Sequence, residues 1–245
     1  MNTLIAVMKR EFSGYFATPV ALVFLIVYLM LSGIFGFFVG GFYERGEADL
    51  DPFFQYQPWL FLFLVPAVSM RLWAEERRSG TLELLLTLPI PTWAAILGKF
   101  LAAWLFIGLA LALSFPNWII VSWLGDPDHG VILAGYIGTF LMAGGYLAIG
   151  TAMSALTRNQ VIAFVLAASV GFLFTVSGLP IVLSAFEGWA PEALTTLIAS
   201  FSFLSRYAAI VAGVLDLKDL LYFLTQILLW LFLSYLILES RKGAS

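Results

Sequence analysis

The sequence has no cysteine and few charged residues. Of its 245 residues, 11% are Asp, Glu, Lys or Arg, against about 25% in soluble domains. The missing cysteine excludes disulfides and thiolate metal sites and leaves the redox compartment open. With 62% hydrophobic residues, a soluble fold of this size would have too little polar surface to cover its core. We therefore expect an all-α integral membrane protein.

Basic tracts are also absent. The 12 Lys and Arg are outnumbered by 15 Asp and Glu, and the net charge is −3. A nucleic-acid partner is therefore not expected, because such proteins carry concentrated positive charge. Membrane lipid is the expected surrounding of the apolar segments.

The apolar residues form runs that are long enough to cross a bilayer, for which about 20 residues are needed. We predict a single transmembrane domain over 1–245, built as a six-helix bundle. The spans are expected at about 20–42, 53–73, 93–123, 131–156, 161–183 and 220–238. Residues 1–18 are amphipathic and are predicted to form an interfacial helix, although an ordinary juxtamembrane helix fits the pattern as well. The first apolar run is too long for a signal-peptide core, so we expect the N-terminus to be retained.

The distribution of basic residues indicates the orientation, because Lys and Arg gather on the inner side. With six spans and both termini inside, nine of the twelve basic residues lie inside; Arg45, Arg206 and Lys218 lie outside. Residues 193–215 are apolar enough for a seventh span, but that span would move Arg241 and Lys242 outside. We therefore predict that 184–219 forms short outer helices, re-entrant or lying on the outer leaflet.

Small residues recur on one face of several predicted spans. This spacing lets a second helix approach closely. The predicted helix-packing positions are Gly36, Gly40, Gly144, Ala148 and Gly171.

The residues that could carry chemistry are few. The only Gly-Lys pair, Gly98–Lys99, is followed by Phe100 and lacks the glycine spacing of a phosphate-binding loop. His129 is the only histidine, so neither a metal site nor a catalytic site is predicted. Arg206 stands alone in an apolar segment; it is either functional or reaches toward lipid headgroups.

The segment Arg71–Pro91 has the densest charge of the predicted inner loops. Glu75 is spaced to pair with Arg71 and Arg78 along a helix. Gly80 permits a sharp bend, and a second short helix with Glu83 near its start can follow. The leucines after Gly80 are excessive for a solvated loop. They indicate either insertion into a partner's groove or a helix on the inner leaflet.

Part of this segment resembles a family signature. The matching residues are Glu76, Gly80, Thr81, Glu83, Leu85 and Pro89. They are similar to the Glu-x-x-x-Gly-Thr-x-Glu…Pro pattern that follows the second span of type-2 ABC transporter permeases. The run Gly213–Leu217 also resembles the gliding-motility-associated permease subunit of that family.

The resemblance implies a coupling helix at 75–88 that docks on a separate ABC ATPase subunit, which binds ATP and Mg²⁺ itself. This chain would need no cofactor. The implied docking residues are Glu75, Glu76, Arg77, Arg78, Gly80, Thr81, Glu83, Leu85 and Pro89. The pair Arg77–Arg78 departs from many relatives, which show an acidic or mixed residue there. The other implied partner is a second permease copy or a related membrane subunit with a large extracytoplasmic domain.

We thus expect the non-catalytic membrane subunit of a bacterial ATP-driven exporter or mechanical transmitter in the inner membrane, with both termini cytoplasmic. Arg206, Gly213 and Asp216 are the predicted outer gate. Two alternatives are a secondary carrier and a membrane-embedded lipid-modifying enzyme. The carrier should show internal repeats and buried charges, whereas the enzyme should turn over without an ATPase.

Overall fold

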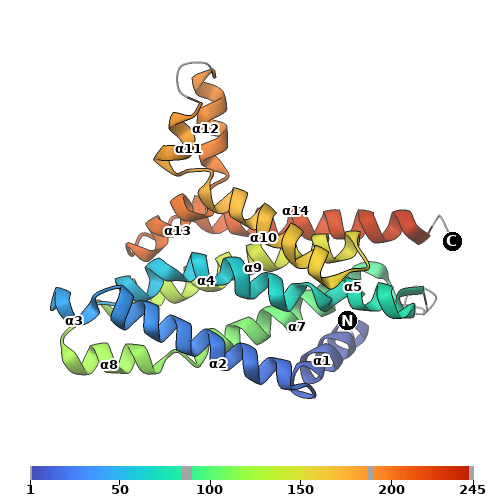
Figure 1. Ribbon diagram of the computed structural model, residues 1–245, viewed down its shortest axis with the longest axis horizontal. Helices are drawn as coiled ribbons and strands as arrows, with labels where there is room; N and C mark the ends of the chain where they lie inside the picture. The colour runs from blue at the N-terminus through green and yellow to red at the C-terminus, as the bar shows by residue number, and fades with distance from the viewer. Residues whose placement is uncertain (1, 84–89, 187–189, 243–245) are drawn as a thin grey trace.

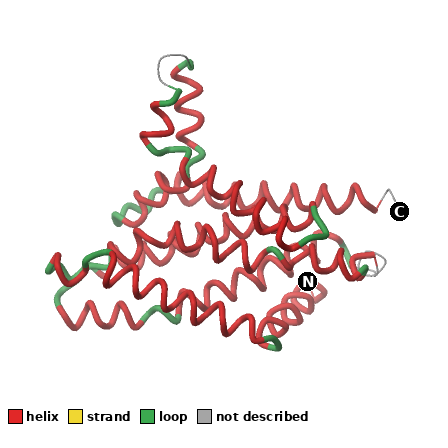
Figure 2. The backbone as a smooth tube through the Cα atoms, viewed as in Figure 1, coloured by secondary structure: helices red, strands yellow, loops and turns green. Residues whose placement is uncertain are grey.

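The chain folds into a bundle of helices, and this computed structural model describes residues 2–83, 90–186 and 190–242. These residues form helices and loops, with no strand among them (Figure 2). The helices are α1 Asn2–Phe16, α2 Pro19–Gly33, the π-helix η1 Ile34–Val39, α3 Phe42–Arg45, α4 Asp51–Ser69, α5 Arg71–Ser79, α7 Thr92–Ala112, α8 Pro116–Leu124, α9 His129–Leu156, α10 Gln160–Val176, α11 Pro180–Ser184, α12 Glu192–Ser200, α13 Phe203–Val211 and α14 Leu217–Lys242. The predicted all-α membrane bundle is confirmed.

Helix α9 is the centre of the bundle. It contacts α4, α5, α7, α10, α13 and α14, and most of its residues are buried. The Asp128 carboxylate caps its start by accepting hydrogen bonds from the Gly130 and Val131 amides, at 2.8 and 3.1 Å. Glycines on α9 let its neighbours approach: a Cβ at Gly150 would lie 1.9 Å from the Ser69 Oγ of α4.

Four described segments are long and apolar enough to cross a membrane. They are Ala21–Arg45, Thr92–Leu124, His129–Leu156 and Leu217–Arg241. Helices α4 and α10 run beside them (Figure 1) and have 19 and 17 residues. The chain is a multi-pass membrane protein, and the count of six spans stays a prediction.

Four of the expected spans are interrupted. The run predicted at 53–73 breaks at Met70, between α4 and α5, and the run predicted at 161–183 breaks over residues 177–179, between α10 and α11. The run predicted at 93–123 is divided into α7 and α8 by a turn over residues 113–115, directly before Pro116, which cannot supply an amide hydrogen to a continuing helix. The run predicted at 20–42 changes from α-helix to π-helix at Ile34, which the sequence reasoning did not foresee.

The predicted short helices of 184–219 take a bent form. Helices α12 and α13 meet at an angle of 60°. Figure 1 shows α11 and α12 projecting from the bundle as a hairpin, while α13 returns to it and packs on α4, α9, α10 and α14. The projecting hairpin contains exposed apolar side chains, with Ile181 78% exposed and Leu197 54% exposed.

Both termini lie at the same end of the bundle, beside α5, and α3 and α8 lie at the opposite end (Figure 1). Amphipathic α1 packs along α7 through Val7, whose side chain is buried. A Cβ at Gly98 of α7 would lie 2.8 Å from the Val7 Cγ1. Ile5 and Phe16, which share the apolar spacing of this helix, are exposed.

Candidate functional site

The start of α5 is held by a hydroxyl from α9. The Ser154 Oγ accepts hydrogen bonds from the Trp73 and Ala74 amides, each 3.0 Å long, and donates to the Met70 carbonyl at 3.0 Å. The hydroxyl thus replaces the backbone carbonyls to which these two amides would donate in a continuous helix. The direction of α5 relative to α4 is set by a residue more than 80 positions along the chain.

A buried lysine joins three helices at this end. Lys99 of α7 is 3% exposed, and its Nζ lies 3.0 Å from Glu11 of α1 and 3.0 Å from Glu76 of α5. The ammonium also lies 5.5 Å from the centre of the buried Trp73 ring. Glu11 binds Arg10 as well, at 2.6 Å. We call Glu11, Glu76 and Lys99 the lysine triad; it ties α1, α5 and α7 to one another.

Glu76 is also bound by the residue that follows the bend. The Thr81 hydroxyl donates a hydrogen bond to the Glu76 carboxylate. Burial raises the pKa of Glu76, but the Lys99 ammonium and the Thr81 hydrogen bond outweigh it, so the net pKa lies below its ordinary value. The carboxylate is therefore charged at neutral pH, as the triad requires.

Of the two adjacent arginines in the predicted docking segment, Arg77 contacts the bundle and Arg78 is exposed. The Arg77 Nη1 donates to the Ala155 carbonyl at the end of α9, at 2.9 Å. Burial lowers the pKa of Arg77, and the positive charges of the nearby Arg241 and Arg158 lower it further. Arg78 is exposed and pairs with Glu75 at 3.2 Å, and Glu75 also accepts a hydrogen bond from Gln160 of α10.

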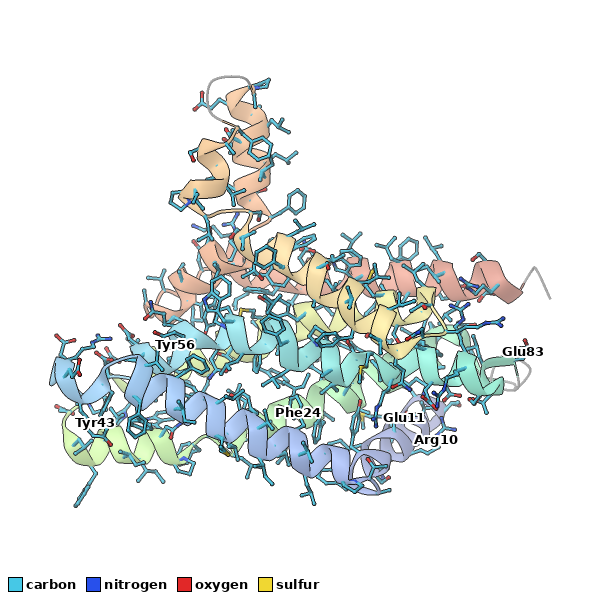
Figure 3. All side chains as sticks on the ribbon, viewed as in Figure 1. Arg10, Glu11, Phe24, Tyr43, Tyr56 and Glu83 are labelled. Atoms are coloured by element: carbon cyan, nitrogen blue, oxygen red, sulfur yellow. The ribbon has the colours of Figure 1, made fainter. Side chains whose placement is uncertain are left out.

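The end of α5 takes the predicted bend. Gly80 has a φ of 75°, a left-handed conformation that favours glycine and ends helices. Beyond it Leu82 is buried, whereas Glu83 is exposed. Figure 3 shows Glu83 beyond Arg10 and Glu11, at the end of the bundle opposite Tyr43. Leu85 and Pro89, also predicted to dock, lie outside the described residues.

The predicted outer residues are only partly brought together. Arg206 of α13 pairs with Asp219 of α14, at 3.0 Å, and lies over the Tyr222 ring. Asp216 instead pairs with Lys218 at 2.8 Å and accepts the Lys218 amide, and these bonds lower its pKa. Gly213 has a φ of 86°, and a Cβ there would lie 2.9 Å from the Val131 Cγ2.

The small residues singled out from the sequence lie at close helix contacts. A Cβ at Gly36 would lie 3.3 Å from the Phe53 Cα, and one at Gly40 would lie 2.4 Å from the Pro52 Cβ. A Cβ at Gly144 would lie 2.8 Å from the Ile227 Cδ1, and one at Gly171 would lie 3.1 Å from the Tyr146 Cδ1. Ala148 is fully buried.

The lone histidine takes part in a local contact. The Trp118 Nε1 donates to the His129 Nδ1 at 3.0 Å. The described part of the chain contains no cluster of three His, Asp or Glu side chains that could hold a metal ion.

Several residues of the site were not singled out by sequence reasoning. Lys99 was used only to infer orientation and to exclude a phosphate-binding loop, and Ser154, Gln160 and Asp219 had no assigned role. Lys99 alone carried a usable indication, because it is a cation between apolar residues of a predicted span.

The fold and this site define a multi-pass membrane subunit with a polar, tightly tied segment at the end that holds both termini. Residues 53–238 match the model of the ABC-2 family transporter proteins. The chain belongs to this family, and it is a membrane permease component of an ABC transporter, whose family partner is an ABC ATPase subunit. A comparison with curated proteins finds no match.

Proposed function

We propose that this chain couples ATP hydrolysis by a separate ATPase subunit to export, or to mechanical transmission, across the bacterial inner membrane. The observation that carries the proposal is the attachment of α5. The lysine triad ties it to α1 and α7, Ser154 ties it to α9, and Glu75 ties it to α10. A displacement of α5 by a docked partner would therefore be passed to four helices at once.

The predicted docking residues divide into two groups under this proposal. Glu75, Glu76 and Arg77 contact other helices of this chain and hold α5 in place, and Thr81 binds Glu76. Arg78, Gly80 and Glu83 are exposed and would form the contact with the ATPase, together with Leu85 and Pro89. The ATPase would bind ATP and Mg²⁺, so this chain would contribute positioning and movement only.

The proposal places the α5 end and both termini in the cytoplasm. Arg77, Arg158 and Arg241 gather at this end, in agreement with the inner-side preference of basic residues. Arg206, Gly213 and Asp216 would then lie at the outer face and act as a gate, with Asp219 as the partner of Arg206.

The proposed membrane partner is a second copy of this chain or a related subunit with a large extracytoplasmic domain, as in the gliding-motility type that the sequence resembles. The projecting α11–α12 hairpin supports such pairing. Its apolar residues Ile181 and Leu197 are exposed, and no helix outside the hairpin is among the main contacts of α11.

Co-expression with the partner ABC ATPase subunit tests the docking surface. Gly80→Val strains the left-handed bend, and Glu83→Arg reverses an exposed charge; we expect each to reduce co-purification and the rise in ATPase rate caused by the membrane subunit. Glu44→Arg, in α3 at the opposite end of the bundle, is the matched control. If both variants retain the wild-type complex and rate, the docking proposal is wrong.

A further inference from the structure

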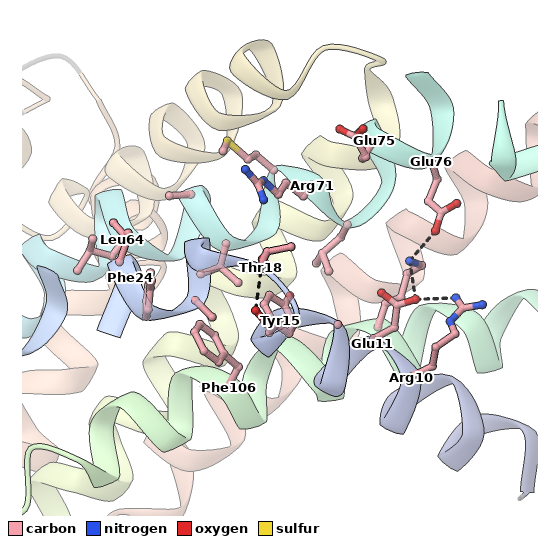
Figure 4. Close-up of a pocket in the computed structure, with 18 of the residues that line it drawn as sticks. Arg10, Glu11, Tyr15, Thr18, Phe24, Leu64, Arg71, Glu75, Glu76 and Phe106 are labelled. Atoms are coloured by element: carbon pink, nitrogen blue, oxygen red, sulfur yellow. Dashed lines mark hydrogen bonds and ion pairs between the residues drawn. The ribbon is translucent and has the colours of Figure 1, made fainter. Parts of the chain in front are cut away.

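An amphipathic cavity of about 790 Å³ opens beside the lysine triad. Its size is within the range of small-molecule sites, about 300–1,000 Å³. Figure 4 shows α1, α2, α4 and α5 around it, with Arg71 above Tyr15 and Thr18. One part is lined by charged groups from α1, α5 and α7, and the other by apolar side chains of α2 and α4.

Among the charged groups that line the cavity, Arg71 is the cation left without an anionic partner. The three lining carboxylates are already bound: Glu11 to Arg10 and Lys99, Glu76 to Lys99, and Glu75 to Arg78. Within the described residues the Arg71 side chain makes no hydrogen bond or ion pair, and Arg71 is exposed. A guanidinium in this state is suited to bind a phosphate through two parallel hydrogen bonds.

The start of α2 adds to the preference for an anion. The helix begins at Pro19 beside the lining residue Thr18, whose side chain does not cap it. The Thr18 hydroxyl instead donates to the Tyr15 carbonyl, at 3.3 Å. The first turn of α2 therefore begins at the cavity, between the lining residues Thr18 and Ala21, and a helix N-terminus favours an anion.

The apolar part of the cavity extends into the depth of one leaflet. Its lining on α2 runs from Ala21 to Val27, which is about 9 Å along a helix, within the roughly 15 Å that one leaflet contributes to the hydrocarbon core. Phe24 and Leu64 lie along it in Figure 4. A charged end followed by an apolar lining of this depth is complementary to the headgroup and the upper acyl chain of one lipid molecule.

We propose that this cavity binds a single anionic phospholipid from the adjacent leaflet. Its phosphate would lie against Arg71 and the first turn of α2, and an acyl chain would lie between α2 and α4. Because α1 and α5 both line the cavity, the bound lipid would brace the segment held by the lysine triad. This inference requires no contact with the ATPase, so the docking experiment can fail without affecting it.

The test uses the purified full-length chain in detergent. Native mass spectrometry would count bound phosphatidylglycerol or phosphatidylcholine of the same acyl chains. We expect at least about tenfold preference for phosphatidylglycerol, because the choline cation of phosphatidylcholine offsets the charge of its phosphate at Arg71, an effect of the size of one charge-assisted contact. Arg71→Gln should remove the preference and Arg71→Lys should keep part of it. Arg158→Gln, an exposed arginine at the same end that does not line the cavity, should keep it whole.

Two further measurements distinguish a lipid site from a site for free phosphate. Ala67→Trp fills the apolar part and should weaken retention of both lipids, whereas 10 mM inorganic phosphate should leave bound phosphatidylglycerol in place. The melting temperature of each variant without added lipid checks that it is folded. Equal retention of the two lipids by the wild-type chain, an unchanged preference in Arg71→Gln, or full displacement by inorganic phosphate would overturn the proposal.

Discussion

The two ends of the bundle are built in different ways. At the α5 end, charged and polar side chains from five helices meet, and the buried Lys99 holds two carboxylates. At the opposite end, the ion pair Arg206–Asp219 joins α13 to α14, and the α11–α12 hairpin leaves the bundle. The comparison teaches that polar contacts between helices concentrate where the family's ATPase partner is expected. At the other end Arg206–Asp219 joins two helices, whereas the pairs of Arg45 with Glu47 and Asp49 and of Asp216 with Lys218 are local.

The largest expected effect concerns the α5 end. Lys99→Met removes the cation and leaves Glu11 and Glu76 facing each other, which should cost about 3 kcal/mol of unfolding free energy. Denaturation in bicelles measures it, with the exposed Lys9→Met as the control, expected to change stability by less than about 0.5 kcal/mol. Equal effects of the two variants would show that the triad does not hold this end.

The opposite end should respond less. Arg206→Gln leaves the buried Asp219 carboxylate without its partner and should cost about 2 kcal/mol, because Arg206 itself is 29% exposed and partly screened. Asp219→Asn should cost less, and the double variant should cost less than the sum of the two. Additive costs in this double-mutant cycle would contradict a direct ion pair.

Acid should weaken the α5 end through Glu76. The pKa of Glu76 is lower in the folded protein than its ordinary value of 4.5. The stabilisation is therefore complete above pH 4.5 and is lost as the pH falls through the lower, folded value. Unfolding measured from pH 7 to pH 3 should show a loss of about 1 kcal/mol from this group, which Glu76→Gln abolishes. An unchanged slope in that variant would assign the acid sensitivity elsewhere.

The smallest effect is expected in the hairpin. Ile181 is 78% exposed, so Ile181→Ser should change the stability of one copy by at most about 0.5 kcal/mol. Ile210 of α13 is fully buried, and Ile210→Ser should cost about 3 kcal/mol or more. If two copies pair through the hairpin, Ile181→Ser should also lower the cross-linked dimer fraction. A large loss of stability in Ile181→Ser would show that the hairpin packs within its own chain.

The sequence alone determined the class of protein. Low charge and long apolar runs require a membrane, since only helices or closed barrels satisfy the backbone there. The Arg71–Pro91 pattern also indicated the permease family, and Gly80 indicated the bend, because few residues adopt a positive φ. These features depend on composition and on local spacing, which a sequence displays directly.

The tertiary structure alone decided which polar groups meet. Glu11, Glu76 and Lys99 lie up to 88 positions apart in the chain, and Ser154 reaches the start of α5 from another helix. The partner of Arg206 is Asp219, which is buried against the bundle. It is not Asp216, which is nearer in sequence but accepts the Lys218 amide at the start of α14. Such pairings follow from helix crossings that side-chain packing sets, and no local pattern in the sequence records them.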